Sequence, residues 1–308
     1  MEKQNSWPRI AVVGAGAVGG YFGGMLARAG APVMMIGRSP FVEKVRSAGL
    51  VLDTQWFKET VAVEASTELS AARRAEAVFF CVKSTDTFAV ARELASFIDR
   101  DAITVSLQNG VDNADRIRTA ANLHALPAVV YVAASVPEPG YVKHVGRGDL
   151  IVGPRGDQTE RLAALFDRAG VPCRIAENIR GELWTKLLWN CALNAISALG
   201  RAKYGRIAES SDGHKLIQNV IDEVLNVARA AQIVLPGLED PKSAMDGAMR
   251  IATQMAGAYS STAQDLYCGK RTEIDSLNGY ISQRGVELGV PTPVNHALFT
   301  LVKLAEDR

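Results

Sequence analysis

Hydrophobic residues in the first half of the chain form short runs separated by longer amphipathic stretches. Several runs, such as residues 78–82, are apolar at successive positions, as expected of strands covered on both faces. The alternation of strand-like and helix-like segments predicts βαβ units around a mostly parallel sheet. The predicted strands are 9–13, 33–36, 61–64, 77–82, 102–107 and 127–134.

Further along this half, residues 141–145 and 149–152 are joined by Gly146-Arg147-Gly148, which predicts a hairpin added at a sheet edge. A helix over 157–169 and a last strand over 171–175 complete the sheet region. After about Asn178 the pattern changes to long helices separated by Gly and Pro, predicted at 181–199, 214–231, 243–267, 272–288 and 293–305. We therefore expect an α/β domain of residues 1–178 and an all-helical domain of residues 179–308.

The composition narrows the possible partners. Lys and Arg total 34 against 33 Asp and Glu, so the net charge of +1 disfavours binding to nucleic acid or to an anionic membrane surface. No apolar run approaches the roughly 18 residues that span a bilayer. Residues 1–7 lack the apolar core of a signal peptide, so we expect a cytoplasmic protein that acts on a small molecule. The four cysteines and four histidines are too scattered to predict a metal site or a histidine-centred triad.

A glycine-rich motif joins the first predicted strand to the first predicted helix, with the residues Gly14-Ala15-Gly16-Ala17-Val18-Gly19. In this pattern Gly14 permits a tight turn, Gly16 lets the backbone approach a pyrophosphate, and Gly19 lets the helix pack close to the sheet. The helix N-terminus would face the anion. Because strand, helix and second strand follow at the expected spacing, the motif favours a Rossmann-type dinucleotide site over a turn that is merely rich in glycine.

The choice of cofactor depends on the end of the second predicted strand, where an acidic residue would bind the ribose 2′-hydroxyl of NAD. The chain has Gly37-Arg38-Ser39 there, and no Asp or Glu occurs between Glu2 and Glu43. Arg38 could instead pair with a 2′-phosphate and stack on the adenine. We therefore predict NADP(H) as the cofactor, the alternative being that Arg38 is an ordinary surface charge.

The predicted helix 181–199 carries three polar side chains in one line. Lys186, Asn190 and Asn194 are spaced by four residues, which places them on one face with a drift of about 40° per step. The rest of the helix is nearly all apolar, so this line faces a polar cavity unless it is a solvated stripe. A partly buried lysine can protonate a carbonyl oxygen as hydride reaches the carbon, so Lys186 is the predicted general acid. The two asparagines offer donors and acceptors to hydroxyl and carbonyl oxygens.

Two other segments are candidates that spacing alone does not decide. Glu273 and Asp275 follow Thr272 and could belong to a site or cap the next helix. The loop 106–110 follows a predicted strand at the edge where open α/β sheets bind ligands. Its Asn109-Gly110 pair could equally form a plain turn.

Five blocks of sequence together resemble the ketopantoate reductase (2-dehydropantoate 2-reductase) family. They are the glycine motif, Cys81-Val82-Lys83, Leu107-Gln108-Asn109-Gly110-Val111, Glu182-Leu183-Trp184 with the line of Lys186, Asn190 and Asn194, and Gln264-Asp265 with Thr272-Glu273-Ile274-Asp275. They occur in the family's order and span nearly the whole chain. The resemblance implies NADPH-dependent reduction of 2-dehydropantoate to (R)-pantoate, on the pathway to pantothenate and coenzyme A. It also implies a Rossmann domain followed by a helical domain of the 6-phosphogluconate dehydrogenase type.

The resemblance also implies roles for individual residues. The proton donor is implied to be Lys186. Substrate contacts are implied for Asn109, Asn190, Asn194 and Ser261. Besides the glycine motif and Arg38, contacts along the cofactor are implied for Lys83, Asn109 and Glu273, the last near the nicotinamide ribose, and for the backbone near Ala134.

Some positions depart from the family pattern. Tyr204 stands where some members have an Asn that contacts the substrate, which makes recognition of the distal end of the substrate uncertain; Thr262 and Ala195 are expected to change only packing. A paralogous reductase of another 2-oxo acid is therefore the nearest alternative, ahead of a β-hydroxyacid or 6-phosphogluconate dehydrogenase. A noncatalytic NADP(H)-sensing protein is disfavoured because the lysine and both asparagines are present. The apolar helices make a homodimer plausible.

Overall fold

The computed structural model describes residues 7–238 and 240–306 of the chain. By its internal contacts the chain divides into two compact units, Met1–Ile179 and Arg180–Arg308. The first is a mixed α/β unit and the second is helical, which confirms the predicted fold class. Within the described ranges, none of the helices has the length and apolar character needed to span a membrane.

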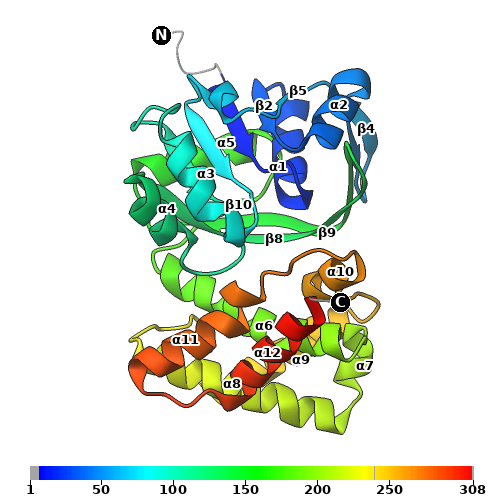
Figure 1. Cartoon of the computed structure of the whole chain (residues 1–308), viewed down its shortest axis with the longest axis vertical. Helices are drawn as coiled ribbons and strands as arrows, with labels where there is room; N and C mark the ends of the chain where they lie inside the picture. The colour runs from blue at the N-terminus through cyan, green and yellow to red at the C-terminus, as the bar shows by residue number, and fades with distance from the viewer. Residues whose placement is uncertain (1–6, 239, 307–308) are drawn as a thin grey trace. The chain divides into compact units, whose positions relative to one another are not determined.

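The first unit is built on one ten-stranded sheet (Figure 1). Its strand order is β4-β3-β9-β8-β7-β6-β1-β2-β5, with β10 paired to β9. The strands are β1 (Ile10–Val13), β2 (Val33–Ile36), β3 (Leu50–Asp53), β4 (Lys58–Val61), β5 (Glu64–Ser66), β6 (Ala77–Phe80), β7 (Ile103–Ser106), β8 (Ala125–Glu138), β9 (Tyr141–Val152) and β10 (Cys173–Ile175). Every pair from β5 through β2, β1, β6 and β7 to β8 is parallel, as the βαβ pattern predicts.

Helices cover both faces of this sheet, and its strands β1 and β6 are apolar at every position. Val12 and Phe79 belong to one buried cluster and their chain neighbours Val13 and Phe80 to another. The first cluster is completed by α1 (Ala17–Arg28) and α5 (Asp157–Arg168), and the second by α3 (Thr87–Leu94), α4 (Asn113–Ala121) and η1 (Leu69–Ala72). The remaining helical segments of this unit are α2 (Ser39–Ala48) and η2 (Ser84–Asp86).

The hairpin expected around Gly146-Arg147-Gly148 is wrong. Residues 141–152 form the single strand β9, which runs antiparallel to the long strand β8, both green in Figure 1. Arg147 and Gly148 have positive φ angles of 56° and 126°, and the register skips Gly148, so these residues form a bulge within the strand. The chain instead reverses just before Tyr141, where Gly140 has φ 73°.

The strand predicted at 61–64 is also wrong, because it falls on the boundary between β4 and β5. Strand β3 had no predicted counterpart, and it forms an antiparallel pair with β4 at the edge of the sheet. Lys58, Glu59 and Thr60 of β4 are all exposed, so this strand lacks the apolar run that marked the central strands.

The second unit has the helices α6 (Ile179–Leu199), α7 (Tyr204–Ala208), α8 (Ser211–Ala230), α9 (Pro241–Gln254), α10 (Ser261–Tyr267), η3 (Ile274–Ser276), α11 (Asn278–Leu288) and α12 (Pro293–Glu306). The single helix predicted over 243–267 is two helices, α9 and α10. The helix predicted over 272–288 begins only at Asn278, after the short turn η3, and α7 had no predicted counterpart.

Candidate functional site

The glycine motif forms the turn between β1 and the start of α1. Gly14 has φ 106°, and a Cβ there would lie 2.5 Å from the backbone of Cys81 and Val82. A Cβ on Gly19 would lie 2.1 Å from the carbonyl oxygen of Gly14. Both glycines are therefore required by close backbone approach.

Gly16, the N-cap residue of α1, has the opposite surroundings. A Cβ built on it meets no atom within 4 Å, and its side of the turn is exposed. No side chain caps the helix, and no acidic residue lies in its first turn. The N–H groups at this helix end are thus open to an anion, and the turn fits the pyrophosphate of a dinucleotide.

The end of β2 lies against the same turn. A Cβ on Gly37 would lie 2.8 Å from the Cβ of Ala15, so the two loops touch. Arg38 follows as the N-cap residue of α2, with an extended backbone and an exposed side chain. The structure thus places an exposed guanidinium one residue from the contact with the glycine motif.

Lys83 and Asn109 follow the neighbouring parallel strands β6 and β7, and so lie at the same edge of the sheet as the glycine motif. A buried side chain, that of Gln108, ties these two loops together. Its Nε2 donates to the carbonyl oxygen of Val82 at 3.0 Å and to Oγ1 of Thr87 at 2.8 Å.

The loop after β7 is fixed at a second point, because Nδ2 of Asn113 donates to the carbonyl oxygen of Asn109 at 2.6 Å. The turn hypothesis for Asn109-Gly110 is compatible with Gly110 at φ 100°. Ala134 lies further along β8, opposite His144 of β9.

In the helical unit, α6 carries Lys186, Asn190 and Asn194. Lys186 and Asn190 are half-buried, whereas Asn194 is only 4% exposed. The helix is otherwise packed on most sides, with Trp184, Leu188 and other apolar residues fully buried. The line is thus not a broad solvated face.

Ser261 is brought next to the end of this line. Its neighbour Ser260 is the N-cap residue of α10 and accepts a hydrogen bond from the backbone N–H of Ala263 at 3.0 Å. The Ser260 hydroxyl also donates to the carbonyl oxygen of Asn194 at 2.9 Å, and its N–H donates to Oγ of Ser197 at 3.1 Å. The start of α10 is therefore anchored on α6.

Tyr204 contacts the same asparagine from α7. Its phenol oxygen donates to Oδ1 of Asn194 at 3.0 Å, and its side chain is buried. Burial raises the pKa of the Tyr204 phenol, so the group stays protonated and able to donate. Tyr204, which departs from the family pattern, thus contacts Asn194, a predicted substrate-binding residue.

Glu273 lies in the segment before η3, where the sequence left a capping role open. Its side chain makes no cap hydrogen bond; the hydroxyl of Thr272 accepts from the N–H of Ile274 at 3.2 Å. Thr272 is held in turn by Glu306 near the end of α12, which accepts from its N–H at 2.7 Å and from its hydroxyl at 2.6 Å.

Glu306 also pairs with Lys303 at 2.8 Å, and Lys303 pairs with Asp275 at 3.1 Å. Burial alone would raise the pKa of Glu306, but its hydrogen bonds with Lys303 and Thr272 outweigh burial and lower the pKa. Asp275, for which the sequence left a capping role open, forms an ion pair with Lys303.

One buried polar network was not predicted. Glu223 of α8 accepts from the N–H groups of Val294 and Asn295 at 2.8 and 2.9 Å, and from Nδ2 of Asn295 at 2.8 Å. Asn295 accepts from Asn278 at 2.9 Å, and Asn278 donates to the carbonyl oxygen of Cys191 on α6 at 3.2 Å. Three helices are thereby linked to the helix that carries Lys186. Pairs so distant in the chain leave no local sequence signal.

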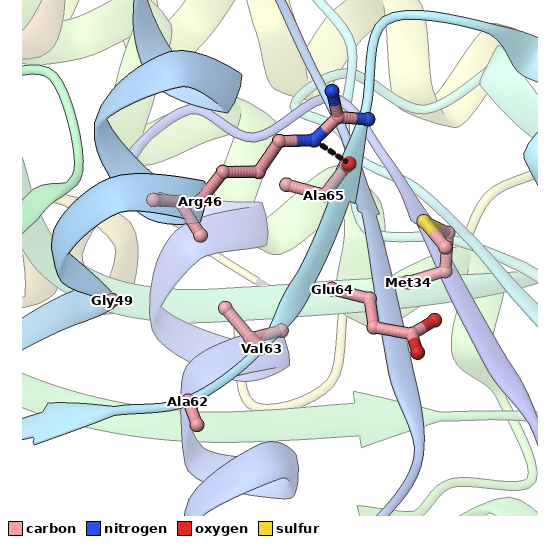
Figure 2. A pocket seen from close by; sticks show the side chains of 8 residues that line it. Met34, Arg46, Gly49, Ala62, Val63, Glu64 and Ala65 are labelled. Atoms are coloured by element: carbon pink, nitrogen blue, oxygen red, sulfur yellow. Dashed lines mark hydrogen bonds between the residues drawn. The ribbon is translucent and has the colours of Figure 1, made fainter.

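A cavity of about 520 Å³ lies elsewhere in the sheet unit. Figure 2 shows its lining, where Nε of Arg46 donates to the carbonyl oxygen of Ala65 at 3.0 Å. Met34 and Glu64 pair at the amino-terminal ends of β2 and β5, whereas the glycine motif and its neighbouring loops lie at the carboxyl ends. The cavity contains none of the predicted site residues. No cluster of three or more metal-ligating side chains occurs within residues 7–238 and 240–306.

Models of known protein families match the sequence of both units. Residues 10–157 match the family model described as Ketopantoate reductase PanE/ApbA, and residues 178–306 match the model of its C-terminal part. A 2-dehydropantoate 2-reductase from Pyrococcus abyssi is 31% identical over 300 residues, covering 96% of this chain and 97% of the relative.

Solved structures agree with this result. A PanE/ApbA family ketopantoate reductase from Ralstonia eutropha JMP134 superimposes with a TM-score of 0.91 at 46% identity, over 97% of this chain and 98% of that one. A D-mandelate dehydrogenase, solved with NADH and anilino(oxo)acetate, superimposes with a TM-score of 0.89 at 25% identity over the same shares. Since both family models match in order and together span most of the sequence, the chain belongs to the ketopantoate reductase family of oxidoreductases.

Proposed function

We propose that this protein reduces 2-dehydropantoate (ketopantoate) to (R)-pantoate with NADPH, and so supplies pantoate for pantothenate and coenzyme A. The observation that carries the proposal is the line of Lys186, Asn190 and Asn194 on an otherwise buried helix in a chain of this family. Residues 1–178 would hold the cofactor, and residues 179–308 would supply the catalytic lysine and most of the substrate contacts.

The first unit supports a dinucleotide because its glycine turn offers uncapped helix N–H groups beside open space at Gly16. In this proposal the pyrophosphate binds at that turn, and Lys83, Asn109, Glu273 and the backbone near Ala134 line the rest of the cofactor. NADPH, when bound, supplies the hydride for the reduction.

The chain's own groups provide the proton and the orientation. Lys186 donates a proton to the oxygen of the substrate's 2-oxo group as that oxygen gains charge. Asn109, Asn190, Asn194 and Ser261 bind the oxygens of the substrate and hold the carbonyl toward the lysine.

The test is to follow NADPH oxidation by the purified protein with ketopantoate. We expect turnover, and expect Lys186→Ala to lower kcat by about a hundredfold or more, as is typical of losing a general acid. Lys215→Ala is the matched control, because Lys215 is an exposed residue of α8 paired with Asp212. No turnover by the unaltered protein refutes the proposed reaction, and an unchanged kcat in Lys186→Ala refutes the role of the lysine.

Selection of NADPH is proposed to rest on Arg38, the exposed N-cap residue of α2 beside the glycine turn. Arg38→Asp should shift the preference from NADPH toward NADH by reversing the charge presented to the 2′-phosphate. Arg92→Asp on α3 is the control for net charge. If Arg38→Asp leaves the ratio of the affinities for NADPH and NADH unchanged, this account is contradicted. NADH is included because a related D-mandelate dehydrogenase was solved with NADH.

A second candidate is reduction of a different 2-oxo acid with the same chemistry. It is favoured by the hydrogen bond between Tyr204 and Asn194, and by the structural likeness to a D-mandelate dehydrogenase. A panel of linear, branched, hydroxylated and aromatic 2-oxo acids, assayed with both cofactors, separates the two candidates. A kcat/KM for ketopantoate well below that of another acid in the panel would favour the second.

A further inference from the structure

Tyr204 and Asn194 form a buried pair in the helical unit. The phenol oxygen donates to Oδ1 of the amide at 3.0 Å, and the two residues are 7% and 4% exposed. The pair is also fixed through its backbone. Tyr204 N–H donates to the carbonyl oxygen of Ala258 at 3.0 Å, and the carbonyl oxygen of Asn194 accepts from Ser260. In this arrangement the amide oxygen faces the phenol.

This contact changes what Asn194 can offer a ligand. An asparagine side chain has one acceptor oxygen and two N–H donors, so its oxygen can accept a hydrogen bond from a ligand hydroxyl while its N–H groups donate to ligand oxygens. Here the phenol occupies one of the two lone pairs of the oxygen, and with Asn194 only 4% exposed the second lone pair has little access to a ligand hydroxyl. The remaining N–H groups suit a carbonyl or carboxylate oxygen, whereas a ligand hydroxyl that must donate finds its acceptor in use.

We propose that Tyr204 is a specificity-determining residue, and that it widens the substrate class to branched 2-oxo acids with or without a hydroxyl at the distal end. This inference rests on the proposed function, in which Asn194 contacts the substrate. A site built to bind a substrate hydroxyl rejects the analogue that lacks it by about four orders of magnitude. With the acceptor occupied by Tyr204, the unaltered protein should discriminate by less than about tenfold.

Two substrates of matched shape make the test direct. Ketopantoate carries a distal hydroxyl, and 3,3-dimethyl-2-oxobutanoate is the same acid without it. The quantity measured is the ratio of their kcat/KM values with NADPH. Tyr204→Phe keeps the ring and removes the donor, so it frees the amide oxygen. We expect the ratio to rise about three- to tenfold in favour of the hydroxylated acid, the effect of one neutral hydrogen bond. A ratio that stays constant or falls overturns the proposal.

Tyr267→Phe is the control variant, because Tyr267 lies in the same unit with 51% of its surface exposed and stacks edge-on with Tyr259. Its ratio should equal that of the unaltered protein. A second variant keeps the test decisive if Tyr204→Phe fails to fold. Asn194→Ala should lower kcat/KM for both acids alike, since the unaltered amide does not accept from the hydroxyl. Selective loss of the hydroxylated substrate in Asn194→Ala would also overturn the proposal.

Failure of the proposed function has a different signature. If neither acid is reduced, the proposed reaction is wrong, and the role of Tyr204 is decided by binding instead. Isothermal titration of NADP-loaded protein with each acid gives the ratio of the two dissociation constants. A roughly three- to tenfold shift of this ratio toward tighter binding of the hydroxylated acid in Tyr204→Phe supports the role of the phenol. An unchanged ratio refutes that role independently of turnover.

Discussion

Replacing Glu223 by alanine should be the most damaging single truncation of a carboxylate in the helical unit. Glu223 is 8% exposed, and its two oxygens accept three hydrogen bonds from the start of α12 at 2.8 to 2.9 Å. Two of the donors are backbone N–H groups at a helix N-terminus, where a negative charge is further stabilised by the helix dipole. The side chain thus acts as a helix cap supplied by a different helix.

The size of the effect follows from what the truncation leaves behind. Each buried donor without an acceptor costs about 1–3 kcal/mol, and the three share one site, so their costs are not additive. We expect Glu223→Ala to lower the free energy of unfolding by about 3–5 kcal/mol, in the lower part of the range that three separate unsatisfied donors would cost. Glu223→Gln keeps one acceptor oxygen and should cost about 1–2 kcal/mol.

The assay must report on the helical unit alone, because two units can unfold in separate transitions. The chain has four tryptophans, of which Trp184 and Trp189 lie in that unit. With Trp7 and Trp56 replaced by Phe, tryptophan fluorescence during urea unfolding reports only the unfolding of the helical unit. Circular dichroism reports the loss of secondary structure in the whole chain.

Asp222→Ala is the matched control for this measurement. Asp222 is the neighbouring carboxylate on α8, and it accepts a single hydrogen bond from Gln218 at 2.8 Å. Its removal should change stability by no more than about 0.5 kcal/mol. If Glu223→Ala also costs under about 1 kcal/mol, the capping account of the network is refuted.

Three further predictions address other parts of the molecule. Gly19→Ala forces the turn to move, since its Cβ would lie 2.1 Å from the carbonyl oxygen of Gly14, and should weaken NADPH binding at least about tenfold in a fluorescence titration; unchanged binding contradicts this. Glu306 has a lowered pKa, so the stability it contributes is present above its ordinary pKa of 4.5 and is lost as the pH falls below it; melting temperatures of Glu306→Gln should lack that acid-side loss. Cys268 is exposed, whereas burial raises the pKa of the other three thiols. One thiol per native chain should therefore react rapidly with a disulfide reagent at pH 8. Cys268→Ser should abolish this rapid reaction.

The sheet was largely predictable because strands such as β1 and β6 are continuous apolar runs, a pattern typical of strands with two covered faces. Prediction failed where tertiary contacts decide the local structure. The apolar periodicity over 243–267 is that of one helix, yet the carbonyl oxygens of Ala256 and Ala258 accept from the N–H groups of Gly205 and Tyr204 on α7. Ser260 then caps a new helix. Neither event follows from the segment's own sequence.

The candidate site divides in the same way. The glycine motif and the line on α6 were found because each function needs given residue types at a fixed spacing. The bond from Tyr204 to Asn194 joins residues on different helices, and the sequence indicated only that Tyr204 departs from the family pattern. Likewise, Gln108 was visible as part of a loop, but its bonds to the loop after β6 depend on two strands lying side by side.

Two separate hydrogen bonds to backbone carbonyl oxygens of α6 help to fix the orientation of the helix and of its line of polar residues. Asn278 donates to the carbonyl oxygen of Cys191, and Ser260 donates to that of Asn194, three residues further along the helix. Successive residues of a helix are rotated by about 100°, so two contacts three residues apart limit rotation of the helix about its axis. Catalytic side chains must be held to within about 10–20° of their working direction. In the proposed reaction, these buried polar contacts of the helical unit also help to set the direction in which the Lys186 side chain leaves the helix.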